Sequence, residues 1–118
     1  PQYHTSADNL DFIRPEHLER SLGLLLQAFS MVERNGTYLN LSPFGEPQLG
    51  RRGLYSLIGG HNEGQKLQLA LLWVLNQSDG TNSLLDITEK ADLPFGLIHQ
   101  AAEALLNCGL LGEGRAQV

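Results

Sequence analysis

The sequence contains one cysteine in 118 residues, few aromatic side chains and no long apolar run. One cysteine excludes an internal disulfide and a paired-cysteine metal site, which favours a reducing, cytoplasmic location. This residue, Cys108, stands at an expected helix end, where we interpret it as a small buried hydrophobe rather than a reactive thiol. Neither a basic-then-apolar leader nor a run of about 18 apolar residues occurs, so the sequence supports neither export nor a membrane span.

The first residues include no Met and open in a polar segment, so we expect the chain to be part of a longer polypeptide. The Leu-rich segment 64–111 is close to the lower size limit, roughly 50 residues, at which a unit can bury an adequate core alone. We therefore expect this segment to pack on the N-terminal half of the chain or on a partner.

Three apolar-periodic stretches within 64–111 predict three helices joined by short connections. The first stretch, 67–75, is apolar at every position except Gln68, and a helix that is apolar all round must be covered on more than one side. The second helix is predicted to begin at Ser83, an N-cap residue with Asp86 three positions later as a capping-box partner.

The third helix is predicted to have Pro94 in its first position and to end before Gly109, which can adopt the left-handed conformation. A Ser-Asp-Gly sequence at 78–80 is expected to form the turn between the first two helices. The residues that follow the third helix leave room for a short wing only. Helix, turn, helix and wing together predict a winged helix-turn-helix.

The N-terminal half contains a helix predicted to run from Pro15 to the Asn35-Gly36 stop signal. Its apolar residues recur at helical spacing, and we interpret them as a core face made to cover a larger sheet: Leu18, Leu22, Leu25, Leu26, Phe29 and Val32. Residues 37–41 and 54–58 resemble short strands within a long loop rich in Pro and Gly. The predicted fold is therefore mainly α with minor β, a winged helix-turn-helix preceded by a long helix and an irregular segment.

The charge of the chain opposes the DNA-reading role that such a fold suggests. The formal net charge is −5, and residues 61–118 hold seven acidic and three basic residues. The third helix contains no Lys or Arg, and its expected outer positions are Gly96, His99, Gln100, Glu103 and Asn107. Because contacts from Lys and Arg to phosphate supply most non-specific affinity, we expect no nucleic-acid partner.

Three stretches are too particular for composition to explain: YHTSADNLDF, NLSPFGEPQLGRRGLY and LALLWVLNQSDGTNSLLDITEKADLPF. Together they resemble the C-terminal third of a bacterial family of zinc-aminopeptidase-like proteins, described as polysaccharide-biosynthesis proteins with an aminopeptidase-like domain and a C-terminal winged helix. The resemblance covers nearly the whole chain, and the loop 40–55 is its most specific part. It implies an upstream peptidase domain as partner, with the winged helix serving packing, gating or oligomerisation.

On this resemblance the chain divides into three parts. Residues 1–35 are the terminal loop and helix of a truncated peptidase-like domain, 36–63 are a connecting loop with short strands, and 64–118 are the winged-helix domain. A homo-oligomer is also compatible with this organisation.

The resemblance implies that His4 is a zinc ligand and that Asp8 supports it from a second shell. A neutral imidazole suits zinc, and a polar loop offers hydrogen-bond partners for it. A catalytic zinc needs about three protein ligands, and the others would precede residue 1. We therefore expect zinc in the full-length hydrolase, none bound tightly to this chain alone, and no activity from this chain by itself.

Arg51 and Arg52 form the only adjacent basic pair. An arginine fork binds carboxylate or phosphate through two parallel hydrogen bonds. The alternative is a loop anchored by arginine to Glu46 or to backbone carbonyls. Because the loop is so distinctive, we expect Glu46, Arg51, Arg52 and Tyr55 to face the active site of the peptidase domain.

A different class of function is a free-standing winged-helix adaptor or regulator that binds protein or nucleic acid. That alternative predicts a native start near residue 1 and a basic recognition face, and the sequence has neither.

Overall fold

The computed structural model describes residues 3–7, 9–45, 47–54 and 61–114, and only the backbone of residues 61–63. The chain forms two compact units, Pro1–Arg34 and Asn35–Val118, and each is described by itself. Among the described residues, no helix combines the length and the hydropathy that a membrane span requires.

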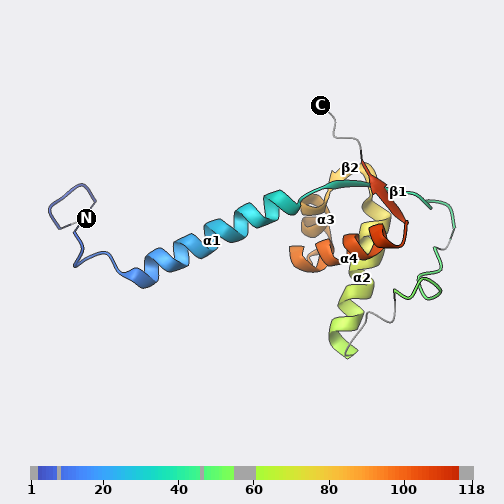
Figure 1. Cartoon of the computed structure of the whole chain (residues 1–118), viewed down its shortest axis with the longest axis horizontal. Coiled ribbons are helices and arrows are strands. Elements are labelled where there is room, and N and C mark those ends of the chain that lie inside the picture. Colours follow the sequence, from blue (N-terminus) through green and yellow to red (C-terminus); the bar gives the residue numbers. More distant parts are fainter. Residues whose placement is uncertain (1–2, 8, 46, 55–60, 115–118) are drawn as a thin grey trace. The chain divides into compact units, whose positions relative to one another are not determined.

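The first unit consists of a polar loop and the helix α1, Pro15–Arg34 (Figure 1). Both predicted ends are confirmed: Pro15 opens the helix, and the chain leaves it before Asn35. Glu16 in the first turn and Arg34 in the last complement the helix dipole. No residue of α1 is buried, and the whole predicted apolar stripe is exposed. Because most helical stability in proteins comes from packing of an apolar face, the exposed stripe is a surface suited to a partner.

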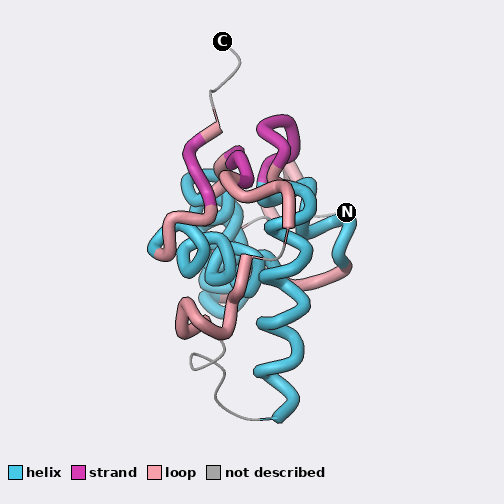
Figure 2. Tube along the Cα trace, turned by 90° about the vertical axis from the view of Figure 1, so that its right-hand side faces the viewer, coloured by secondary structure: helices cyan, strands magenta, loops and turns pink. Residues whose placement is uncertain are grey.

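The second unit contains the remaining helices and strands, with its three strands side by side (Figure 2). In chain order these are β1 Thr37–Asn40, α2 His61–Gln77, β2 Asp79–Ser83, α3 Leu84–Ala91, α4 Phe95–Asn107 and β3 Leu111–Glu113. This arrangement confirms the predicted mainly α fold with minor β.

The strands form an antiparallel sheet in the order β2-β1-β3. The first strand of the unit is thus the central one, and Tyr38 faces Glu113 of the wing. The sequence placed 36–63 apart from 64–118 as a connection. In the structure β1 pairs with both later strands, and the compact unit Asn35–Val118 contains all three. The predicted boundary between 63 and 64 stays a prediction.

The connection between α2 and α3 differs from the predicted turn, because β2 occupies it. The Asp79 carboxylate accepts hydrogen bonds from the backbone N–H groups of Thr81 and Asn82, at 2.8 and 3.2 Å, and Gly80 has a φ of 87°. The chain therefore turns here as expected and then continues as a strand, since β1 supplies its ladder. A polar Asp-Gly-Thr-Asn sequence gives no alternating signal for that strand.

The helix ends follow the predicted capping signals closely. Ser83 caps α3, and the reciprocal hydrogen bonds with Asp86 complete the capping box. Pro94 is the N-cap of α4 and not its first helical residue, a correction of one position. At the other end Gly109 has a φ of 67°, and the N–H of Leu110 donates to the carbonyl of Leu105 at 2.9 Å, as in a Schellman motif.

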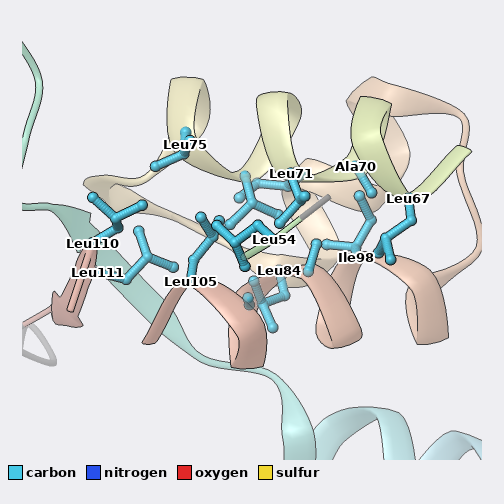
Figure 3. Packing of buried hydrophobic residues seen from close by; sticks show 14 of the residues in the cluster. Leu54, Leu67, Ala70, Leu71, Leu75, Leu84, Ile98, Leu105, Leu110 and Leu111 are labelled. Carbon is cyan, nitrogen blue, oxygen red and sulfur yellow. The ribbon is translucent and has the colours of Figure 1, made fainter. Parts of the chain in front are cut away.

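The core lies between α2, α3 and α4, and it includes two residues of the 41–54 loop (Figure 3). Leu54 from this loop lies among the leucines of α2 and α4. The helix α2 is buried along one broad face but leaves Leu69 and Leu72 exposed. Among the described residues of the unit, none supplies the second cover that the sequence predicted for this helix.

Candidate functional site

Two buried leucines hold the loop 41–54 to the winged-helix core. Leu49 and Leu54 are both buried, and the N–H of Leu54 donates to the carbonyl of Leu49 at 3.1 Å. From Gln48 onward the chain forms a compact turn, in which the carbonyl of Gln48 accepts from the backbone N–H groups of Arg51 and Arg52, at 3.0 and 3.3 Å. The buried leucines thus fix a loop whose polar side chains face outward.

Arg52 ties this loop to the end of α4. Its Nε donates to the carbonyl of Pro47 at 3.0 Å, and its Nη1 donates to the carbonyl of Cys108 at 2.8 Å. The Cys108 thiol in turn lies 3.8 Å from the carbonyl oxygen of Arg52. For this arginine the structure shows the anchoring alternative, with backbone carbonyls as the partners.

Arg51 differs from its neighbour. Among the described residues, no hydrogen bond or ion pair engages its guanidinium, and the side chain is exposed. It borders an open pocket of about 350 Å³. The residues that line this pocket come from one loop: Ser42, Phe44, Gly45, Pro47, Gln48, Arg51 and Arg52.

The other predicted site residues do not meet in the described structure. His4 lies in the first unit, exposed, with a φ of 60° and its ring 4.0 Å from that of Tyr3. Asp8, Glu46 and Tyr55 lie outside the described residues. Their predicted roles, and that of His4 as a ligand, stay predictions.

A zinc site requires several His, Cys, Asp or Glu side chains close together. Within the described part of the chain, no group of three or more His, Cys, Asp and Glu side chains is arranged to hold a metal ion. Because a catalytic zinc takes about three protein ligands, the described residues do not form a complete zinc site.

The outer face of α4 is the surface that would meet DNA in a winged helix that reads it. Its predicted outer positions are indeed exposed or half-buried. The His99 Nδ1 lies 3.6 Å from the Glu103 carboxylate, and no Lys or Arg belongs to Phe95–Asn107. This helix therefore presents no cation to a phosphate backbone.

A polar network around β2 escaped the sequence analysis, although the Asp-Gly-Thr-Asn pattern is a signal for it. The Thr81 hydroxyl and N–H, followed by the N–H of Asn82, lower the pKa of the Asp79 carboxyl to about 2. Lys90 Nζ donates to the Asn82 side chain at 2.7 Å and to that of Gln77 at 3.2 Å. These bonds join β2 to α2 and α3, so we interpret the network as structural.

Comparison with known proteins divides the chain at nearly the same place as the structure does. A family model described as winged helix-turn-helix matches residues 36–113. A second model, described as a domain of unknown function, matches residues 1–35.

Two relatives match nearly the whole chain. A Clostridium acetobutylicum protein named as a polysaccharide biosynthesis protein with an aminopeptidase-like domain is 49% identical over 109 residues, 92% of this chain and 25% of that protein. A crystal structure of a protein from the same organism, named as a peptidase, matches with a TM-score of 0.80 and 43% identity, over 96% of this chain and 24% of that one. The chain thus spans about a quarter of the length of these relatives.

The resemblance inferred from the three sequence stretches is confirmed by these matches. The sheet order, the capped α3 and α4 and the short wing agree with the description of the family model that covers residues 36–113. The chain belongs to the winged helix-turn-helix family.

Proposed function

We propose that this chain works as part of a longer, zinc-dependent aminopeptidase-like hydrolase, in which the winged helix packs against the hydrolase domain and does not read DNA. The observation that carries the proposal is the exposure of the apolar stripe of α1. Its residues match a different family model from the winged helix, and its apolar stripe is exposed. Fully burying one such side chain contributes about 1.5–3 kcal/mol, so the stripe is a strong drive for docking.

The exposed side of α2 supports the same conclusion. Leu69 and Leu72 lie on a face of this helix that the winged-helix core leaves open. A packing role gives both apolar surfaces a partner within one protein. The cytoplasmic location and an oligomeric assembly stay predictions beside this proposal.

The acidic character of the unit supports packing over DNA reading. With no basic residue on α4, the main source of non-specific affinity for a duplex is missing from the helix that would enter the groove. We expect no binding of a fluorescein-labelled duplex in an anisotropy titration at moderate salt. Saturable binding that weakens steeply with added salt would favour the adaptor or regulator alternative instead.

Zinc dependence is proposed for the longer protein, with His4 as one ligand. We expect His4→Ala to remove stoichiometric zinc from that protein while the winged-helix unit stays folded, because the two lie in separate units. His17→Ala, a second exposed histidine of the first unit, is the matched control and should retain the metal. Metal analysis decides the point: unchanged zinc in the His4 variant would contradict the assignment.

A further inference from the structure

The loop 41–54 combines a fixed backbone with two exposed side chains next to one pocket. Its backbone is fixed by the buried Leu49 and Leu54, yet Phe44 is 96% exposed and Arg51 projects without a partner among the described residues. The aromatic ring of Phe44 and the guanidinium of Arg51 line the same open pocket. Binding sites commonly combine an apolar wall with a few polar groups in this way.

We propose that this pocket binds the carboxylate of a peptide, with Arg51 as the anion-binding residue. The proposal rests on the proposed function, which supplies peptides as the ligand class. The pocket holds about 350 Å³, enough for a carboxylate and the residue that bears it.

The donors in the pocket suit a planar anion. The Arg51 guanidinium is free to offer two parallel N–H groups, the geometry that matches a carboxylate. Arg52 uses Nε and Nη1 on the carbonyls of Pro47 and Cys108, so only its Nη2 is left for a ligand. Ser42 and Gln48 add neutral donors, and no acidic side chain lines the pocket among the described residues.

The loop also fixes the backbone of Arg51 before a ligand arrives. Gln48 adopts a left-handed φ of 51°, and in this conformation its carbonyl accepts from the N–H groups of Arg51 and Arg52. Strain at a non-glycine residue persists when its surroundings fix it, as the two buried leucines and the Arg52 clamp do here. Less ordering of the loop backbone is then required on binding, which favours affinity.

Phe44 distinguishes a carboxylate on an organic residue from a bare oxyanion. Its exposed ring lines the same pocket as Arg51 and gives an apolar wall to the side chain next to the carboxylate. Inorganic phosphate could use the arginine but would gain nothing from the ring.

The test is to titrate each of three ligands into the 118-residue chain and to monitor binding by the NMR chemical shifts of the chain. The three ligands are an N-acetylated dipeptide ending in phenylalanine with a free carboxylate, the same dipeptide as its amide, and inorganic phosphate. We expect the free acid to bind at least ten-fold more tightly than the amide or phosphate. Charge-assisted hydrogen bonds of this kind correspond to about 10- to 100-fold in affinity.

Variants assign the contact. Arg51→Gln should weaken binding of the free acid at least ten-fold, and Arg20→Gln, an exposed arginine of the other unit, should leave it unchanged. Phe44→Ala should reduce the ratio of the affinity for the free-acid dipeptide to the affinity for phosphate. All three side chains are exposed, so the variants are expected to fold.

Several results would overturn the assignment. They are equal binding of acid and amide, tighter binding of phosphate, undiminished binding by Arg51→Gln, or no shift at all. The titration needs neither zinc nor turnover, so its failure is distinguishable from failure of the proposed hydrolase role.

Discussion

Two adjacent leucines of α2 offer a sharp test of which face of this helix is core. Leu71 is 1% exposed and Leu72 is 51% exposed. Replacing a buried leucine by alanine loses its transfer free energy and leaves a cavity, at a cost of about 2–5 kcal/mol. Leu72 already keeps half its surface in water, so Leu72→Ala should cost below about 1 kcal/mol. A domain of the size of Asn35–Val118 has a free energy of unfolding of about 4–13 kcal/mol. Leu71→Ala should therefore remove a large share of this free energy.

The assay is urea unfolding of the 118-residue chain. Trp73 is the single tryptophan and packs against the core, so its fluorescence reports the unfolding of this unit. We expect the midpoint for Leu71→Ala to fall well below that for Leu72→Ala, with the slope unchanged. Equal losses for the two variants, or a loss under about 1 kcal/mol for Leu71→Ala, would refute the packing described for α2.

The remaining predictions concern caps, turns and pH. Ser83→Ala should cost about 1 kcal/mol and lower the midpoint of thermal unfolding by about 4–8 °C, whereas Ser21→Ala, which removes only a hydrogen bond to the carbonyl of His17 in α1, should not. Gly109→Ala should destabilise by about 1–2 kcal/mol because its φ of 67° is left-handed, while Gly96→Ala, in open space within α4, should stabilise by about 0.5–1 kcal/mol. The pKa of Asp79 is about 2 in the folded chain against its ordinary value of 3.8, so the stability that it contributes is present above about pH 4 and is lost towards pH 2. Thermal unfolding of Asp79→Asn should therefore depend less on pH in that window, and a profile parallel to that of the natural chain would contradict this.

The helices could be predicted because their signals are local. Pro15 at the start of α1, the Ser83–Asp86 capping box and Gly109 each act within one turn of their own residues. The one-position error at Pro94 is of the size that helix ends commonly show.

The sheet and the loop contacts could not be predicted in the same way. β2 is a strand because β1, about 40 residues earlier in the chain, pairs with it, and no period within 79–83 carries that information. The anchoring of Arg52 likewise depends on the carbonyl of Cys108, a partner 56 positions away. The sequence indicates the arginine pair as a candidate. Only the fold shows that the Arg52 guanidinium is hydrogen-bonded to backbone carbonyls, whereas no described residue binds that of Arg51.

We propose above that α1 packs in a hydrolase domain, which covers its apolar face in the longer protein. Amide hydrogen exchange of α1, measured in the 118-residue chain and in the longer protein, tests it most directly. We expect the amides of α1 to exchange fast in the 118-residue chain, where no residue of the helix is buried. In the longer protein we expect the same amides to be strongly protected. Equal exchange of α1 in both proteins, whether fast or slow, would contradict it.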